Sequence, residues 1–510
     1  MDEHSTPSVV DLGALRSATG FFVPTANMQA PFAVEEDTGR WRFGATFRDS
    51  PQSLRDQVLD IVRGAREKVF VTSFILGDEQ LSRELIAAAD RLNGGVYVIS
   101  ELSEASLRRG LARLAEAQEK DPQITAKVEQ EKKRFMSLTR RGIALRGHEN
   151  CHAKFVVADD AIAWVGSANL ETRAFTEVGE AGVVITEPLE VGRLARLFAR
   201  MWLTGCQWWL PSTSTYSVQN LKESRLQCPL PFDVPAPEPT AGRPAIIWTD
   251  AEDESLLATI RDIIDSAENS LLLASYTLDG MSTNPDLILE RIGKAVAQGV
   301  EVTMLVRANN HRDRHRRDAT AFHDLGVRLV ADDLNHAKAA VADENRGALF
   351  SANFEARHGL IAGSGMEIGA RLDGTTALAK LTRYLRHAIE TATYTFDPAP
   401  HQLQLNDRRV SRRPQWPLPN RMKVLANPDV WHRFTRGAVR GPALWTRQGG
   451  QLELLVGDRR WPLGPDKAGN LRMGHSQATE LSTIEQLTAW EQRTPRDVTW
   501  GYCPAALERR

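Results

Sequence analysis

The sequence predicts an α/β protein with two pseudo-twofold-related α-β-α lobes, each built on a mostly parallel sheet, and a small β-containing C-terminal domain. Three observations support this prediction: a stretch of 22 residues that occurs twice, a similar order of helical and strand-like segments before each copy, and a change of composition near the C-terminus. Alternating helical and strand patterns are typical of parallel sheets covered by helices. The 510 residues also exceed what one ordinary core accommodates.

The repeated stretch organises the chain. HAKFVVADDAIAWVGSANLETR (152–173) and HAKAAVADENRGALFSANFEAR (336–357) are identical at eleven of 22 positions without a gap. Internal repeats of this kind indicate a duplicated structural unit. We therefore expect the two copies to work together.

Changes of pattern along the chain define its expected domains. The lobes are separated by a segment with six prolines, which disfavours helix and strand and is typical of an extended linker. The expected parts are an N-terminal extension at 1–44, a first lobe at 45–227, the Pro-rich linker at 228–247, a second lobe at 248–397, and a basic linker with the C-terminal domain at 398–510.

The two lobes begin with similar segments. SLRDQVLDIVRGAREKVFVTSFIL (53–76) and SLLATIRDIIDSAENSLLLASYTL (255–278) each show helical spacing of apolar residues and then a buried-strand run, so that Ser73-Phe74 corresponds to Ser275-Tyr276. A second helix and another strand follow in each lobe before the repeated stretch.

The first lobe carries a highly charged helical insertion at about 104–142. It has two interpretations: a lid or clamp over a substrate, or a solvated helical hairpin. Charge runs of mixed sign usually face water, which favours the hairpin. In the C-terminal domain, ALWTRQGGQLELLVGDRRWPL (443–463) predicts short strands around Gly-Gly and Gly-Asp turns.

Composition excludes several classes of protein. The net charge of −2 gives no whole-chain attraction to nucleic acid or anionic lipid. The acidic N-terminus lacks a signal-peptide pattern, and no apolar run approaches the ~18–20 residues of a membrane span. The four cysteines show neither a zinc nor a disulfide spacing. We therefore expect a cytoplasmic protein with reduced thiols and no metal centre.

The residues common to both copies suit phosphoryl chemistry. In a strand, a His and a Lys two residues apart point to one face. The Lys supplies charge to non-bridging oxygens, and the Ser and Asn of the later S-A-N can donate hydrogen bonds to them. Two histidines can divide a displacement, one attacking phosphorus and the other protonating the leaving oxygen. The phosphate-binding candidates are Ser167, Asn169, Ser351 and Asn353.

Each histidine also needs an acceptor that holds its tautomer. Glu177 and Glu367 follow their copies in matching E-[VI]-G contexts and are the candidates for this role.

The doubled pattern H-x-K-x4-D followed by S-x-N resembles the phospholipase D superfamily, the HKD phosphodiesterases. The resemblance covers roughly residues 45–397. It implies one metal-free, cofactor-free site across a pseudo-twofold interface within a single chain, so that dimerisation is not required. It also implies a phosphohistidine intermediate. The site would be formed by His152, Lys154, His336 and Lys338.

The resemblance further implies a role for individual positions. His152 would attack and His336 would act as the acid, while the two motif asparagines would bind phosphate oxygens. Asp159 and Asp343 would be structural. One departure concerns the residue before the motif serine, which is Gly166 in the first copy and the bulky Phe350 in the second.

The pattern indicates the reaction and leaves the substrate open. Residues 401–447 carry ten Arg or Lys against two Asp, with three interleaved tryptophans, and HRDRHRRD (311–318) is a second basic cluster. Basic and aromatic side chains together favour nucleic acid, so we predict a nuclease. The alternatives are a phospholipase D or phosphatidyltransferase and a non-catalytic nucleic-acid or membrane adaptor. The candidate nucleic-acid contacts are Arg408, Arg409, Arg412, Arg413 and Trp416.

Overall fold

The computed structural model describes residues 19–400 except for short gaps, and outside that range it describes strands only. The gaps fall at 26, 28–29, 36–37, 49–52, 116–117, 222–229 and 238–241. The chain divides into two units, residues 27–393 and the two chain ends together. Each unit is described by itself.

The first lobe is built on a sheet of nine strands in the order β11-β10-β6-β5-β4-β7-β8-β9-β3. Only the pairs β4–β5 and β5–β6 are parallel. The strands are β3 (Trp41–Thr46), β4 (Val69–Thr72), β5 (Val96–Ser100), β6 (Ala144–Gly147), β7 (Phe155–Ala158), β8 (Ile162–Gly166), β9 (Glu180–Ile185), β10 (Trp208–Trp209) and β11 (Gln219–Asn220).

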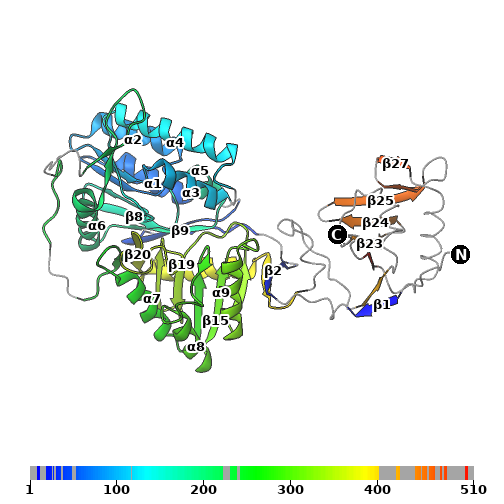
Figure 1. Ribbon diagram of the computed structural model, residues 1–510. Coiled ribbons are helices and arrows are strands. Elements are labelled where there is room, and N and C mark those ends of the chain that lie inside the picture. Colours follow the sequence, from blue (N-terminus) through cyan, green and yellow to red (C-terminus); the bar gives the residue numbers. More distant parts are fainter. Residues whose placement is uncertain are drawn as a thin grey trace. The chain divides into compact units, whose positions relative to one another are not determined.

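Most helices of the first lobe cover the outer face of this sheet, whereas α6 packs on its inner face (Figure 1). Their ends follow local sequence signals: Asp78 caps the second helix by accepting the N–H of Leu81, and Asp121 precedes a proline at the start of the fourth. The helices are α1 (Ser53–Gly64), α2 (Glu79–Arg91), α3 (Glu104–Ala115), α4 (Pro122–Arg140), α5 (Thr172–Thr176), α6 (Pro188–Arg200) and a π-helix (Met201–Gly205).

The second lobe repeats this plan. Its main strands follow the order β12-β20-β18-β17-β13-β15-β16, and a small β14–β19 pair lies beside them. The strands are β12 (Ile246–Thr249), β13 (Ser270–Ala274), β14 (Leu278–Asp279), β15 (Glu301–Val306), β16 (Arg328–Ala331), β17 (Ala339–Ala342), β18 (Arg346–Phe350), β19 (Phe354–Glu355) and β20 (Glu367–Arg371). The helices are α7 (Ser255–Asp265), α8 (Leu289–Ala297), α9 (Asp313–Asp324) and α10 (Thr376–Glu390).

Both sheets are mixed, and the prediction of mostly parallel sheets was wrong. Helical crossovers join β4-β5-β6 and β13-β15-β16 in parallel. The repeated stretch then forms one tight antiparallel hairpin in each lobe, β7-β8 and β17-β18. After a longer connection, β9 and β20 pair antiparallel with β8 and β18. Short connections can only join antiparallel neighbours, and this is the physical reason for the mixture.

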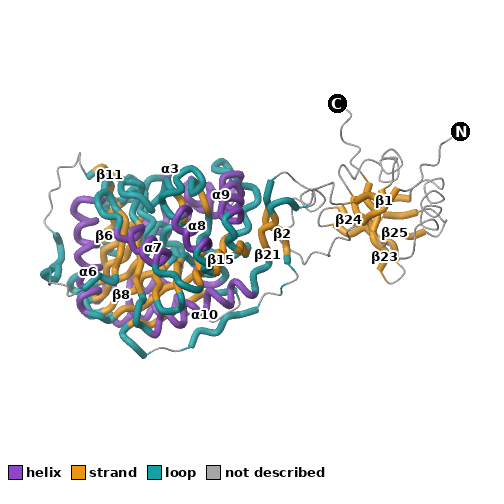
Figure 2. Tube along the Cα trace, turned by 90° about the horizontal axis from the view of Figure 1, so that it is seen from below, coloured by secondary structure: helices purple, strands orange, loops and turns teal. Residues whose placement is uncertain are grey.

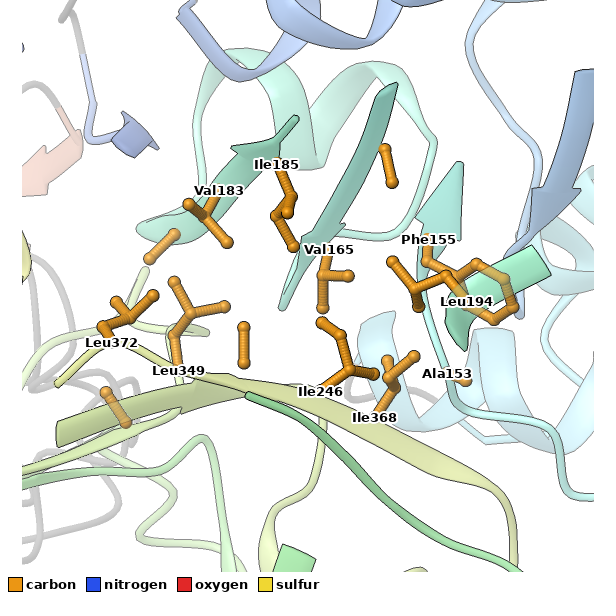
Figure 3. Close-up of a cluster of buried hydrophobic side chains, with 14 of the residues drawn as sticks. Ala153, Phe155, Val165, Val183, Ile185, Leu194, Ile246, Leu349, Ile368 and Leu372 are labelled. Carbon is orange, nitrogen blue, oxygen red and sulfur yellow. The ribbon is translucent and has the colours of Figure 1, made fainter. Parts of the chain in front are cut away.

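A shared hydrophobic core joins the lobes, because the inner faces of the two sheets pack against each other (Figure 3). Val165 and Val183 of the first lobe belong to the same cluster as Leu349 and Ile368 of the second. Side chains of α6 and α10 also contribute, and both helices can be followed in Figure 2. The active-site copies therefore belong to one packed body.

The edges of this body differ from the expected boundaries. The boundary at 44/45 falls inside β3, which pairs with β9. The Pro-rich segment contacts the first lobe: Phe232 is buried in the shared core, and the backbone oxygens of Pro231 and Asp233 accept hydrogen bonds from Tyr97 and Lys68.

The other unit contains a sheet of eight strands, seven of them after residue 420. Strands occur in the 443–463 region where the sequence predicted them. The sheet order is β1-β22-β28-β23-β24-β25-β26-β27, and β2 (Phe21–Pro24) pairs antiparallel with β21 (Tyr394–Asp397). The eight strands are β1 (Ser8–Asp11), β22 (Arg421–Val424), β23 (Ala443–Gln448), β24 (Gln451–Val456), β25 (Arg459–Pro465), β26 (Leu471–Met473), β27 (Ser476–Ala478) and β28 (Trp500–Cys503). Among the described residues, no helix has the length and apolar character that a membrane span requires.

Candidate active site

The two motif histidines lie just before the central strands β7 and β17, and each is bonded to the opposite lobe. The backbone N–H of His152 donates to the oxygen of Met366 at 2.8 Å, and that of His336 donates to the oxygen of Gly179 at 2.9 Å. These bonds follow the approximate twofold relation between the lobes. They bring both histidines to one cavity.

Each imidazole is held by a glutamate of the opposite lobe. His152 Nδ1 lies 2.8 Å from Glu367 Oε1, and His336 Nδ1 lies 2.6 Å from Glu180 Oε1. Each glutamate is the first residue of its strand, directly after the residue that accepts the histidine N–H. With Nδ1 engaged, Nε2 is the nitrogen left for chemistry in each ring.

The structure corrects the role predicted for Glu177, because another glutamate holds His336. Its side chain is 62% exposed and lies 3.5 Å from Arg173, whereas Glu180 occupies the position beside His336. The sequence carried a usable signal, because E-x-G occurs again at 180–182. Glu180 lies 28 residues after His152, closer than Glu177 to the 31-residue spacing of the second copy, and it starts an apolar strand.

The motif serines hold the glutamates, which corrects their assignment as phosphate ligands. The Ser167 hydroxyl donates to Glu180 and accepts the N–H of Ala181; Ser351 does the same with Glu367 and Ile368. Both serines are fully buried. A hydroxyl used on both sides in this way has no remaining direction toward a substrate.

Of the two motif asparagines, one lines the cavity. Asn353 lines it, and its Nδ2 lies 3.4 Å from Glu355 Oε1. Asn169 is buried at the equivalent position, and neither Oδ1 atom has a hydrogen-bond partner among the described residues.

Both motif lysines are completely buried. Lys154 Nζ donates to the oxygen of His152, and Lys338 Nζ lies 2.6 Å from the oxygen of His336 and 3.0 Å from its Nδ1. Burial lowers the pKa of Lys154 to about 7 and that of Lys338 to about 8, against the opposing effect of the nearby glutamates. A bound phosphate anion would restore their charge.

Burial also lowers the pKa of both histidines, that of His336 to about 3. Burial raises the pKa of Glu180 and Glu367, but contact with the imidazoles and lysines outweighs it and the pKa of each carboxyl lies below its ordinary value. The substrate-free site therefore contains neutral imidazoles beside ionised carboxylates. A neutral imidazole is the nucleophilic form.

Asp159 and Asp343 hold backbone. Each has a positive φ in the turn after its motif strand, 54° and 49° respectively. Each carboxylate accepts three backbone N–H groups from the segment that leads into β4 or β13. Aspartate tolerates this left-handed conformation better than most residues.

The residues before the two motif serines differ in size, but neither of them reaches the cavity. Phe350 is buried and its ring centroid lies 6.2 Å from that of Phe354. Gly166 lies against Trp164, where a Cβ would approach the indole to 2.5 Å. Neither Phe350 nor Gly166 lines the cavity.

The cavity has a volume of about 120 Å³, and both histidines line it. The His152 side chain is 27% exposed and that of His336 is 5% exposed. The wall between them includes Phe74, Gly110 and Tyr276. No three His, Cys, Asp or Glu side chains in the described part of the chain are grouped so that they could hold a metal ion. Arg408, Arg409, Arg412, Arg413 and Trp416 lie outside the described residues.

Comparison with solved structures shows a similar fold. The Haemophilus influenzae phosphatidylserine synthase structure matches with a TM-score of 0.52 at 12% identity, over 75% of this chain and 90% of that one. A structure of Nuc, a phospholipase D family member from Salmonella typhimurium, gives a TM-score of 0.26 at 20% identity, over 34% of this chain and 99% of that one. The first likeness shows the fold, and the second is too low to support an argument.

Sequence comparison gives a more specific result. A Caenorhabditis elegans protein named as a probable phospholipase D is 27% identical over 188 residues, which are 34% of this chain and about a third (32%) of that protein. The family model described as "Cardiolipin synthase, PLD-like domain" matches residues 58–202 and 260–389, more than half of the chain. The matched segments contain both histidine–lysine copies, and the chain therefore belongs to this phospholipase D-like family of phosphodiesterases within the phospholipase D superfamily.

Proposed function

We propose that this phosphodiesterase acts on phospholipids, either releasing the headgroup with water or transferring the phosphatidyl group to another alcohol. One observation carries the proposal: the two segments that supply both histidines match a family model described by a lipid synthase. The name of the Caenorhabditis elegans relative also supports a lipid. The nucleic-acid substrate favoured by the basic C-terminal region has no comparable support, because its candidate contacts lie outside the described residues.

The geometry accounts for a two-step reaction. His152 Nε2 attacks phosphorus and the ester P–O bond breaks. The negative charge of the bound phosphate favours protonation of His336 at Nε2, and His336 gives this proton to the leaving oxygen. Water or an alcohol then attacks phosphorus, the P–N bond to His152 breaks and frees that imidazole, and the proton of the attacking hydroxyl returns to His336. The two lysines and the motif asparagines would stabilise the charge on the non-bridging oxygens, and the cross-lobe glutamates hold the imidazoles throughout.

A substrate panel in EDTA tests this proposal. Purified protein is incubated with phosphatidylglycerol or phosphatidylcholine vesicles with and without added glycerol, and separately with single- and double-stranded DNA and RNA. We expect headgroup release or a new phosphatidyl alcohol, and no such product from the His152→Ala variant. Asp60→Asn, a change at an exposed position of α1, serves as the matched control.

Three results would contradict parts of the proposal. Cleavage of nucleic acid, with the lipid left intact, would favour the nuclease function over the lipid function. Loss of lipid turnover in EDTA would exclude a metal-independent reaction. A phosphoenzyme that is trapped in His152→Ala but not in His336→Ala would exchange the roles of the two histidines.

A further inference from the structure

The two halves of the cavity have matching backbone frames. Ser73 and Ser275 each accept, at 3.1 Å, the N–H of the residue that follows the motif asparagine. The next residues, Phe74 and Tyr276, therefore occupy equivalent positions, and both line the cavity. Differences between these halves can be compared position by position.

The aromatic residues contact the histidines of their own lobes. The Phe74 and His152 ring centroids are 6.0 Å apart, and those of Tyr276 and His336 are 4.8 Å apart. Each aromatic ring therefore forms the cavity wall beside one histidine, and a substrate group bound on that side would contact it.

The two lobes carry different ionisable groups at one equivalent position. The N–H of Ser73 donates to Ile99 and that of Ser275 donates to Leu305, which aligns Glu101 with Arg307 two residues later. Glu101 is completely buried and Arg307 is 9% exposed. Equivalent positions thus carry a carboxylic acid in the first lobe and a guanidinium in the second.

Further cations gather around Tyr276. The Arg307 guanidinium lies 5.2 Å from the ring centroid, that of Arg312 lies 5.9 Å away, and Lys338 Nζ lies 5.8 Å away. Cations at such distances from a ring face are attracted to it and are held in place. Three cations therefore surround the ring that forms the cavity wall beside His336.

The first lobe has a carboxyl, only partly ionised at neutral pH, where the second lobe has a cation. Burial raises the pKa of Glu101 to about 7 and also raises that of Glu171 to about 7. Glu171 has a counterpart in the second copy, Glu355, so this carboxyl is common to both halves. The two lobes therefore differ in charge because Arg307 stands where the first lobe has Glu101, and because Arg312 lies beside Tyr276.

From this asymmetry we propose that the half beside Tyr276, Arg307 and Arg312 receives the leaving headgroup, and that the preferred headgroup carries a negative charge of its own, such as a phosphorylated alcohol. This inference rests on the proposed lipid function. The P–O bond that breaks leaves its electron pair on the headgroup oxygen, which then takes the proton of His336. Cations on this side stabilise both that developing charge and the charge already on the headgroup.

The space for such a headgroup adjoins the catalytic cavity. A second cavity of about 330 Å³ shares Glu355 with it and is lined by Arg312, Asp313 and Arg314. The Asp313 carboxylate pairs with Arg316. Asp279 also lines this cavity and lies 3.5 Å from Arg314. Arg312 therefore lines the second cavity and lies over the ring of Tyr276, which forms part of the catalytic cavity wall.

Short-chain lipids below their micellar concentration test the proposal. The wild type and Arg312→Gln are compared on dihexanoyl phosphatidylcholine and on the dihexanoyl lipid whose headgroup is glycerol phosphate. We expect the wild type to prefer the phosphorylated headgroup in kcat/KM, and Arg312→Gln to lose about tenfold of that preference, as for the loss of a hydrogen bond to a charged group. Arg317→Gln, which removes one exposed charge from the same helix, should keep it.

Calorimetric binding of glycerol 3-phosphate and of choline gives a second measurement that does not depend on turnover. Glycerol 3-phosphate should bind the wild type and Arg317→Gln better than Arg312→Gln, and choline should not distinguish the variants. Lipid turnover without a headgroup preference, or an equal loss in both variants, would overturn this inference and leave the lipid function standing. Binding of glycerol 3-phosphate that depends on Arg312, without any lipid turnover, would contradict the lipid function and leave the anion site standing.

Discussion

At the scale of single residues, the site is defined by contacts that cross between the lobes. His152 is held by Glu367 and His336 by Glu180, and each glutamate is held in turn by the serine of its own lobe. A carboxylate behind an imidazole fixes the tautomer and stabilises the ring when it becomes positive. This residue-to-residue arrangement predicts which glutamates matter for the reaction.

Glu180→Gln should reduce kcat by about 100-fold or more, by analogy with the loss of the carboxylate behind a catalytic histidine. Glu177→Gln, which changes the exposed glutamate three residues earlier, should leave kcat unchanged. Steady-state kinetics with thermal unfolding as a folding control measures both. Equal loss in the two variants would contradict the assignment of Glu180.

The buried lysines predict how anion binding depends on pH. The pKa of Lys154 is lowered to about 7 and that of Lys338 to about 8, so both lose charge as the pH rises through this range. A bound anion favours the charged forms and raises these pKa values. Sulfate, which does not titrate here, should bind with proton uptake at pH 7.5, and its affinity should fall between pH 7 and 9. Calorimetry in buffers of different ionisation enthalpy measures the uptake, and a pH-independent affinity would contradict it.

At the scale of elements, the insertion of the first lobe is part of the site. Its helices α3 and α4 form a small core with Ile75, to which Leu111 and Val128 contribute and on which Phe74 packs. Gly110 of α3 lines the catalytic cavity. The solvated hairpin favoured by the charge pattern does not describe this contact, because the apolar face of α3 covers the residues that follow β4.

Gly110→Ala should lower kcat/KM about tenfold, the scale of a small misplacement at an active site. The added Cβ would lie 2.2 Å from the Phe74 ring, so that either the ring or α3 must shift. Gly64→Ala in α1 is the matched control, since nothing lies within 4 Å of its Cβ. Steady-state kinetics on one diester substrate compare the two variants. An unchanged kcat/KM in Gly110→Ala would contradict the placement of α3 in the cavity wall.

At the scale of the whole molecule, residues 27–393 behave as one body because their lobes share a core. The inner faces of the two sheets bury each other, and this packing holds each glutamate against the histidine of the other lobe. Separation of the lobes would therefore dismantle both halves of the site at once.

Leu349→Ala should destabilise both lobes together by about 2–5 kcal/mol, the usual cost of such a buried truncation. Leu349 is completely buried in the shared core, whereas Leu203, 49% exposed, offers a matched control that should change stability by less than about 0.5 kcal/mol. Hydrogen exchange followed by mass spectrometry would show faster exchange in strands of both sheets. Exchange confined to the second lobe would contradict a single cooperative body.

The amino-acid sequence by itself determined the duplicated α/β plan, the positions of both histidine–lysine pairs and the role expected for Glu367, because ungapped repetition and strand periodicity are local properties. The sheet direction, the position of Glu180, the buried serines and the contact of α3 with Phe74 were decided only by the tertiary structure. Each of these depends on which segments far apart in the chain pack together. The difference between Glu101 and Arg307 likewise acquires meaning only when the two lobes face one cavity.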